Sequence, residues 1–253
     1  MGKPIREYRI EHLQEEASKV DRSKNIHVTD LSRCLAGVWQ EKTGRAKVEH
    51  NESKLRRFDA GHIIESRVLE ALESKGVLHS AQGSLDWPEL NMTGSYDMII
   101  NEDDGMWLVE VKSIHPYGIS HLYKSNKVHE HYLEQVNLYL SKLREEYPEI
   151  KARIYYEALD GRTFEQEIKY NQLIVEKALE KAKTLKKAID TDTMPDPPEI
   201  FVKENNGWKL NWRVEYCLTS GLHQKCDPKT AIDPDPEKCI SKLKYQSKKL
   251  NNK

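Results

Sequence analysis

The chain has 253 residues, of which 32% are charged and 38% hydrophobic, and its 40 basic and 41 acidic residues leave a net charge of -1. This balance excludes a uniformly basic nucleic-acid coat, but it does not exclude a local basic channel. No stretch approaches the ~18 apolar residues of a membrane span, and the start MGKPIREYRIEHLQ lacks the apolar core of a signal peptide. We therefore expect a soluble, cytoplasmic (intracellular) protein with no membrane partner.

In chain order, the sequence predicts a polar arm, two helices, a three-stranded meander, a third helix, a hairpin and a fourth helix. Thr29 is a candidate cap for the first helix, and Gly76 is a stop signal for the second. Asn171 is a candidate cap for the last helix, and Asp160-Gly161 is a turn signal. This order predicts a mixed α/β core around one sheet. The predicted bounds are about 29–44, 53–75, 81–87, 92–100, 106–113, 128–147, 152–158, 163–168 and 171–189.

Charged residues occupy one face of the hairpin formed by the second and third strands. Because side chains alternate along a strand, Glu110 and Lys112 share a face. A NEDDG turn that pairs Asn101 with Met106 sets Asp97 opposite Glu110. Two carboxylates opposite each other destabilise a sheet, unless a divalent cation such as Mg²⁺ or Mn²⁺ binds them. If this face is exposed, the alternative is an ordinary cross-strand ion pair.

The helices before and after this hairpin add further polar residues. In the 53–75 helix, His62 and Glu65 project inwards from an apolar stripe, where an imidazole could join the carboxylates as a ligand. Gln135 and Tyr139 lie four residues apart at the edge of the apolar stripe of the 128–147 helix. The structural alternatives are a hydrogen-bonded core histidine and two polar residues that merely border the core. The first stripe comprises Leu55, Phe58, Leu69 and Leu72.

Four short motifs therefore follow one another on matching elements. They are Gly61-His62-Ile63-Ile64-Glu65, Gly94-Ser95-Tyr96-Asp97, Glu110-Val111-Lys112 and Gln135-Val136-Asn137-Leu138-Tyr139. In this order and spacing they resemble the PD-(D/E)xK nuclease superfamily, in its RecB-like branch, over about residues 29–190. The Pro-Asp dipeptide of the family name is replaced by Tyr96-Asp97. The resemblance implies an α/β, restriction-endonuclease-like core with a central mixed sheet flanked by helices.

The resemblance also implies a metal site. His62, Asp97 and Glu110 would bind Mg²⁺ or Mn²⁺, together with the backbone carbonyl of Val111. The metal would lower the pKa of a bound water and polarise the phosphodiester. Whether one or two ions act is open.

Other matched residues would serve the reaction or the substrate. Lys112 would stabilise the attacking hydroxide or the charge that develops on phosphorus. Gln135 would position Lys112 or the scissile phosphate, and Tyr139 would help to hold the strand. Candidates for contact with DNA are Glu65, Lys124, Lys127, His129 and His131, with Tyr117 or Tyr123 stacking on bases.

One cysteine precedes the core and three follow it. In a sub-branch of the family, which includes CRISPR-adaptation exonucleases and helicase-nucleases, cysteines so distributed bind a [4Fe-4S] cluster. The resemblance thus implies a cluster that joins the N- and C-terminal segments through Cys34, Cys217, Cys226 and Cys239. Eight and twelve residues separate the last three cysteines, which is wider than the usual family spacing. Zinc, with His223 as a substitute ligand, and unligated buried thiols are the alternatives.

We expect a metal-dependent DNA nuclease, an exonuclease on single-stranded DNA or DNA ends. The alternatives are a structure-specific or nicking endonuclease, a catalytically idle iron–sulfur DNA-binding subunit and a zinc-dependent DNA-binding module. The chain has no GxxxxGK[ST] motif, so unwinding would need a helicase partner, as in recombination or CRISPR adaptation. The predicted organisation is an arm (1–28), a nuclease core (29–195), a cysteine-bearing region (196–239) and a basic tail (240–253).

Overall fold

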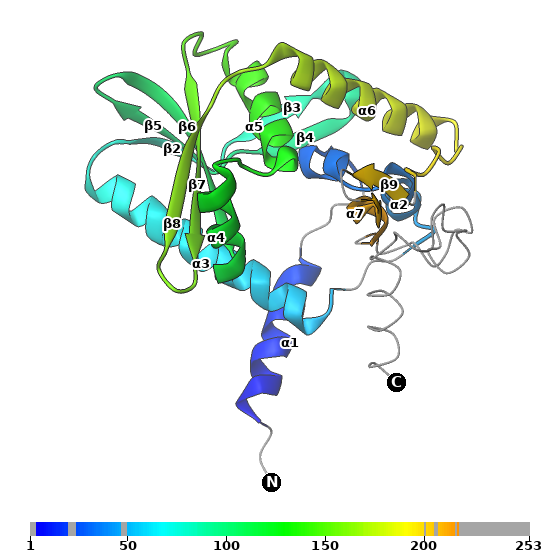
Figure 1. Cartoon of the computed structure of the whole chain (residues 1–253), viewed down its shortest axis with the longest axis horizontal. Helices are drawn as coiled ribbons and strands as arrows, with labels where there is room; N and C mark the ends of the chain where they lie inside the picture. The colour runs from blue at the N-terminus through cyan, green and yellow to red at the C-terminus, as the bar shows by residue number, and fades with distance from the viewer. Residues whose placement is uncertain are drawn as a thin grey trace. The chain divides into compact units, whose positions relative to one another are not determined.

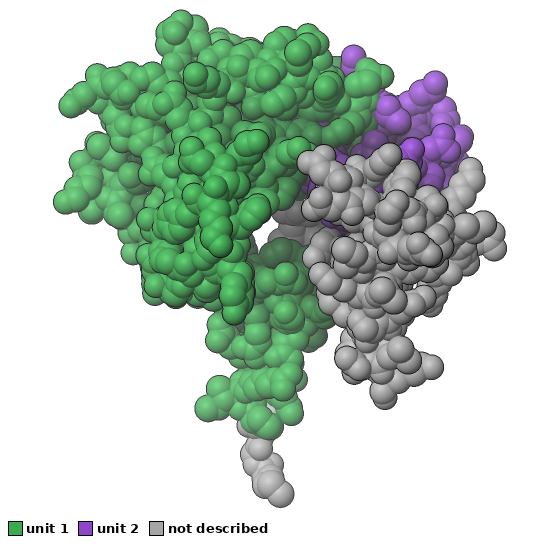
Figure 2. Space-filling view, viewed as in Figure 1, with its two compact units in different colours: residues 1–29, 49–182 green, residues 30–48, 183–253 purple. Residues whose placement is uncertain are grey.

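The computed structural model describes residues 4–19, 24–46, 50–199, 201–204, 207–215 and 217. The chain divides into two compact units, which Figure 2 colours separately: residues 1–29 with 49–182, and residues 30–48 with 183–253. Residues 30–48 thus group with the C-terminal part of the chain, although the predicted nuclease core runs unbroken over 29–195. The predicted basic tail (240–253) lies outside the described residues, and so do Cys226 and Cys239 of the predicted cysteine-bearing region.

A five-stranded mixed sheet forms the centre of the first unit (Figure 1). Its strand order is β2-β5-β6-β7-β8, in which only β6 and β7 pair in parallel. Parallel neighbours need a crossover connection, and here two helices, α4 and α5, lie between β6 and β7 in the chain. The strands are β2 (Leu78–Ala81), β5 (Met98–Glu102), β6 (Gly105–Ile114), β7 (Lys151–Ala158) and β8 (Thr163–Ile168).

Helices cover both faces of this sheet. On one face, Ile64 of α3 (Glu52–Ser74) packs into a buried apolar cluster with Val109 and Val111 of β6. On the other face, α4 (Pro116–Ser125) and α5 (Glu130–Leu143) pack against β7, as Figure 1 shows. This arrangement is the predicted mixed sheet flanked by helices, and it is consistent with a restriction-endonuclease-like core. Glu110 and Lys112 lie on the α5 face, because they alternate with the two valines.

A second, three-stranded sheet corrects the predicted meander. The strands predicted over 81–87 and 92–100 each break in two, at Gln82-Gly83 and at Tyr96-Asp97. Gln82 adopts a left-handed φ of 52°, which no regular strand tolerates. The halves join different sheets, so one central sheet does not account for all the strands. The second sheet has the order β1-β4-β3, made of β1 (Ile26–His27), β4 (Met92–Ser95) and β3 (Ser84–Trp87), and a 3₁₀ turn (Pro88–Leu90) links β3 to β4.

The remaining elements lie toward the two ends of the chain. The helix predicted over 29–44 is wrong in its first third, where a 3₁₀ helix (Val28–Ser32) precedes α2 (Leu35–Lys42) and Cys34 takes the N-cap position in place of Thr29. Asn171 caps the last long helix as predicted, since its Oδ1 accepts the N–H of Leu173 at 3.0 Å. The other elements are α1 (Ile5–Ser18), α6 (Gln172–Asp190), β9 (Phe201–Glu204), β10 (Gly207–Leu210) and α7 (Trp212–Glu215).

The end of α3 agrees with its prediction, whereas α4 was not predicted. Gly76 has a φ of 69° directly after α3, as its predicted role of C-terminal stop requires. The helix α4 is absent from the predicted elements, since Pro116 and Gly118 read as loop residues; Pro116 instead occupies the first turn of the helix. Among the described residues, none of the helices combines the length and the apolar composition that crossing a bilayer needs.

Candidate active site

The predicted hairpin register is confirmed. Asn101 pairs with Met106, and Met98 pairs with Val109 at the start of β5. Asp97 immediately precedes this pair, at the level of Glu110. Its Oδ2 accepts a hydrogen bond from the backbone N–H of Val111 at 2.7 Å. The two carboxylates are therefore neighbours at the end of the hairpin.

Glu110 lies at the centre of the site. Its side chain is only 1% exposed. One oxygen, Oε1, forms an ion pair with Lys112 and accepts a hydrogen bond from the Gln135 Nε2 at 2.7 Å. The other oxygen, Oε2, is buried and has no hydrogen-bond partner within the described residues. An unpaired carboxylate oxygen in the interior is costly unless a proton, a water or a cation meets it.

Burial is the largest single influence on the pKa of Glu110, Asp97 and Lys112, the three ionisable groups of the site. It raises the pKa of Glu110 to about 7, although the attraction of Lys112 opposes the rise. It also raises the pKa of Asp97, again against the pull of Lys112. Burial disfavours the charge on Lys112, but Glu110 and Asp97 together outweigh it and hold the pKa of that ammonium above its usual range. The site therefore keeps its cation, while both carboxylates are destabilised in their charged form.

Helix α5 supplies the residues that orient Glu110. The Gln135 Nε2 also donates to the hydroxyl of Tyr139 at 3.1 Å, and both side chains are buried on one face of the helix. The Tyr139 ring in turn lies against Gly94 of β4, where an added Cβ would come within 2.6 Å of the tyrosine Cε1. The absence of a side chain at Gly94 thus allows Tyr139, and through it Gln135, to approach the carboxylate.

We predict that Gly94→Ala lowers the free energy of unfolding by about 1–3 kcal/mol. The new methyl group meets Tyr139 at 2.6 Å and Val28 Cγ2 at 3.0 Å, and both contacts are too short for a packed interior. Urea denaturation measures the change. The exposed neighbour Ser95 provides the control, since Ser95→Ala should have almost no effect. Equal stability of the two variants would contradict the close packing at Gly94.

Helix α3 departs from its prediction. His62 is exposed, and so is Phe58 at 45%, so the prediction that His62 points inwards from a buried stripe is wrong. The fully buried side chains of α3 are Leu55 and Ile64, and Leu69 and Leu72 of the predicted stripe pack against the cluster around Ile64, so the stripe is correct in part. Glu65 is half-buried, and its charge adds to the rise in the pKa of Glu110. Of the two predicted polar residues of this helix, Glu65 is thus the one whose charge is felt by the carboxylates.

Tyr132 is a residue of the site that is not among the candidates named from the sequence. The Lys112 Nζ lies 5.1 Å from the centre of the Tyr132 ring, within the range of a cation–π contact. Tyr132 precedes Gln135 by three residues, so the two share a face of α5. This three-residue spacing in the sequence could have identified Tyr132 as a residue of the site. The contact itself depends on how the crossover helix lies over β6.

The donor set fits a hard divalent cation that keeps several water ligands. Within the described residues, no group of three or more His, Cys, Asp and Glu side chains is arranged to hold a metal ion. Mg²⁺ commonly binds through only one or two carboxylates and retains waters. Asp97 and the unpartnered oxygen of Glu110 meet that requirement, and a cation there would offset the repulsion between two buried acids.

The predicted DNA contacts are distributed over α4 and α5. Lys124 and Lys127 are exposed, at the end of α4 and just after it. His131 is half-buried, with its ring 4.0 Å from that of Tyr132. Of the cysteines, Cys34 is buried and Cys217 is half-buried, and within the described part of the chain they form no disulfide. Cys226 and Cys239 lie outside the described residues, so the four-cysteine cluster stays a prediction.

The fold has solved counterparts. The crystal structure of SSO0001 aligns with a TM-score of 0.54 at 20% identity, over 90% of this chain and 98% of that one. An alkaline exonuclease (LHK-Exo) from Laribacter hongkongensis aligns with a TM-score of 0.51 at 12% identity, over 72% of this chain and 93% of that one. Its complex with dAMP gives the same score at 11% identity, over 68% and 90% of the two chains. These likenesses show the fold. No curated protein matches the sequence.

The family follows from the sequence match. The family model of the PD-(D/E)XK nuclease superfamily matches residues 6–201, which is well over half of the chain. The chain belongs to the PD-(D/E)XK nuclease superfamily. The match includes all four motifs, from Gly61 to Tyr139, and the hairpin that carries Asp97 and Glu110.

Proposed function

We propose that this protein is a metal-dependent deoxyribonuclease, and that it acts as an exonuclease on single-stranded DNA or DNA ends. One observation carries the proposal: the fully buried carboxylate of Glu110 has an oxygen without a partner beside a second carboxylate. Lys112 pairs with the other oxygen of Glu110, and a divalent cation would give this one a partner and offset the repulsion between the two acids. The exonuclease assignment is supported by the alkaline exonuclease of similar fold, whose structure with dAMP contains a deoxynucleotide.

The proposal gives each residue of the site a task. Asp97, Glu110, the backbone carbonyl of Val111 and the exposed His62 would hold Mg²⁺ or Mn²⁺. When bound, such an ion supplies a water of lowered pKa and polarises the phosphodiester. Lys112, held as a cation by its two acidic neighbours, would stabilise negative charge on the phosphoryl oxygens. Gln135 occupies one oxygen of Glu110, which leaves the other available.

The decisive experiment compares linear with circular single-stranded DNA, each incubated with Mg²⁺, Mn²⁺ or EDTA. An exonuclease should degrade the linear strand in either metal, leave the circle intact and do nothing in EDTA. Cleavage of the circle would support the endonuclease alternative instead. The absence of hydrolysis in both metals, with protein shown to be folded, would overturn the proposed function and favour an idle DNA-binding subunit.

The RecB-like iron–sulfur sub-branch is a finer part of the same proposal. It requires a [4Fe-4S] cluster on Cys34, Cys217, Cys226 and Cys239, and it includes a helicase or CRISPR-adaptation partner. Protein purified without oxygen should be brown and absorb near ~400 nm, which is typical of iron bound by thiolates. Colourless protein containing zinc would replace this assignment, without affecting the nuclease site.

A further inference from the structure

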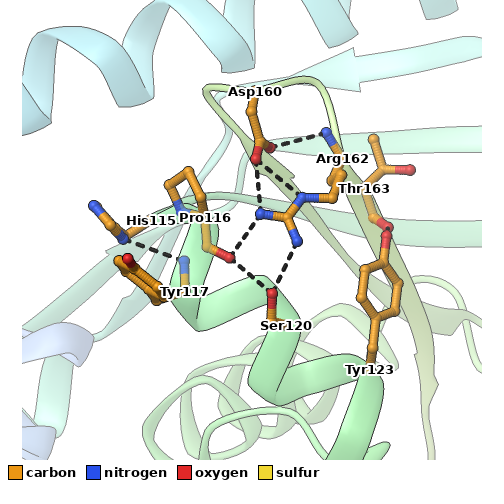
Figure 3. Close-up of polar contacts among 8 residues, drawn as sticks. All are labelled: His115, Pro116, Tyr117, Ser120, Tyr123, Asp160, Arg162 and Thr163. Atoms are coloured by element: carbon orange, nitrogen blue, oxygen red, sulfur yellow. Dashed lines mark hydrogen bonds and ion pairs between the residues drawn. The ribbon is translucent and has the colours of Figure 1, made fainter.

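Helix α4 places an aromatic pair on the surface directly after the strand that carries Glu110 and Lys112. Tyr117 is 84% exposed. Its ring stacks on that of His115, with centroids 5.4 Å apart and planes inclined by only 15°. The His115 Nδ1 also accepts the backbone N–H of Tyr117 at 3.2 Å, which caps the helix and orients the imidazole (Figure 3). One face of the Tyr117 ring thus lies against His115, and the rest of the side chain is exposed to solvent.

The same face of α4 continues with cationic and polar groups. Tyr117, His121 and Lys124 are spaced i, i+4 and i+7, and all three are exposed. Ile119 and Leu122 are buried on the opposite side of the helix. The helix itself brings no acidic group to this face, because residues 113–129 contain no Asp or Glu in a chain with 41 acids, and the neighbouring Asp160 is paired with Arg162. A helix surface with a stacking ring, a cation and no acids of its own suits a nucleic-acid strand.

Polar contacts fix α4 rigidly to the sheet, as Figure 3 shows. The Arg162 guanidinium, in the turn between β7 and β8, donates to the Ser120 Oγ at 2.8 Å and to the Pro116 carbonyl at 2.9 Å, and it pairs with Asp160 at 2.7 Å. The Tyr123 hydroxyl donates to the Thr163 carbonyl. Tyr123 therefore has a structural partner for its polar group, whereas Tyr117 is left as the ring available for stacking.

The helix also begins close to the candidate active site. A Cβ at Gly118 would lie 2.7 Å from the side chain of Ile114, so the first turn of α4 packs directly on the end of β6. Tyr117 follows Lys112 by five residues, and a chain of that length spans at most about 18 Å. A strand whose scissile phosphate met Lys112 would have a base only a few nucleotides away within reach of Tyr117.

We infer that the exposed face of α4 binds single-stranded DNA as it enters the active site. Tyr117, backed by His115, stacks on a base, and Lys124 contacts a phosphate. The inference rests on the proposed nuclease function for the direction of the strand, but the binding surface is defined by α4 alone. Stacking on a tyrosine is tolerant of sequence, so the surface should accept any unpaired base.

Binding of a fluorescent 15-nucleotide oligothymidine in EDTA tests this inference without cleavage. Fluorescence anisotropy should show that Tyr117→Ala weakens binding by about 5- to 100-fold, while Tyr117→Phe stays within about twofold of wild type. The matched control is Tyr8→Ala, which removes another exposed tyrosine ring, 58% exposed on α1. Lys124→Gln should reduce the slope of log affinity against log salt by about 0.7, the value of one phosphate contact.

An oligonucleotide with abasic sites separates stacking from backbone contact. Wild type should bind it as weakly as Tyr117→Ala binds the normal strand, and Tyr117→Ala should lose nothing further. Stacking is refuted if Tyr117→Ala weakens binding of the normal and the abasic oligonucleotide by the same factor. It is also refuted if Tyr117→Phe binds the normal strand as poorly as Tyr117→Ala. Unchanged binding by Tyr117→Ala also overturns the inference.

A substrate without bases distinguishes this inference from the proposed function. Bis(p-nitrophenyl) phosphate has a phosphodiester but no nucleobase, so wild type should hydrolyse it in Mn²⁺ and Glu110→Gln should not. On single-stranded DNA, Tyr117→Ala should act mainly by raising KM. If wild type hydrolyses neither substrate, the nuclease proposal fails, whereas the anisotropy measurements still decide whether α4 binds the strand.

Discussion

Replacing Glu110 by glutamine is expected to abolish DNA hydrolysis and, at the same time, to stabilise the metal-free protein. The amide oxygen can still accept the bonds from Lys112 and Gln135 that Oε1 accepts now. The amide nitrogen would replace the unpartnered Oε2. The free energy of burying a neutral amide is smaller than that of burying a charged carboxylate. We expect a gain of about 1–3 kcal/mol in EDTA at pH 8, or a few degrees in Tm.

The gain should depend on pH in a defined direction. The pKa of Glu110 in the folded, metal-free protein is raised to about 7 from its ordinary 4.5. A carboxyl group with a raised folded pKa destabilises the fold when it ionises, so wild type should lose stability between about pH 5 and pH 8. Glu110→Gln should lose less, and the two proteins should converge near pH 5. Thermal unfolding in EDTA across this range measures the difference.

The activity of the same variant should fall by about 10²–10⁴-fold, because an anionic metal ligand is lost. Addition of Mn²⁺ should raise the Tm of wild type but not that of Glu110→Gln. Glu167→Gln, on the exposed face of β8, is the matched control and should leave both properties unchanged. A Glu110→Gln variant that still degrades DNA at the wild-type rate would remove Glu110 from the reaction.

Replacing Lys112 by methionine should have the opposite effect on stability. Its ammonium is the nearest cation to Glu110 and also attracts Asp97, so its loss leaves two carboxylates without compensation. Breaking a buried ion pair typically costs 3–5 kcal/mol, and we expect about 3 because the lysine side chain is 17% exposed. Hydrolysis should decrease by about 10²–10³-fold through the loss of charge stabilisation.

The surface offers a matched comparison for this variant. Lys142, in the last turn of α5, pairs with Glu145 just beyond the helix, and the glutamate side chain is 64% exposed. Exposed pairs contribute little, so Lys142→Met should change stability by less than about 1 kcal/mol. Combining Lys112→Met with Glu110→Gln should recover part of the lost stability, since each change removes the partner of the other. If Lys112→Met unfolds at the wild-type urea concentration, the ion pair is not a structural one.

The local chemistry of the hairpin was predictable because strand geometry determines it. A short acidic turn set the pairing of Asn101 with Met106, and alternation then put Glu110 and Lys112 on one face. The same reasoning could not show that the chain leaves one sheet at Asp97 and another at Gln82. Such breaks depend on tertiary pairing: β4 pairs with β1 and β3, whereas β5 pairs with β2 and β6.

The helices show where periodicity is insufficient. On α3, His62 was assigned to the inward face but is exposed, whereas Ile64, two residues later, is buried. In α5, residues 135–140 are all buried, so Gln135 and Tyr139 lie in the interior and not at the border of a stripe. The contact of Lys112 with Tyr132 joins two elements through a crossover, and no local pattern encodes it. Motif spacing therefore identifies which residues meet, but not every neighbour that orients them.

Arg162 ties helix α4 to the bend that joins β7 to β8. Its guanidinium bonds the Pro116 carbonyl and the Ser120 Oγ of the helix as well as Asp160 of the bend, so we expect binding on the helix to restrain the bend. Deuterium uptake at the amides of residues 158–163 should consequently slow when an oligonucleotide occupies α4, although none of those amides touches it. A dye attached at the exposed Gly161 bend would then report strand capture in real time, ahead of any chemistry at Glu110.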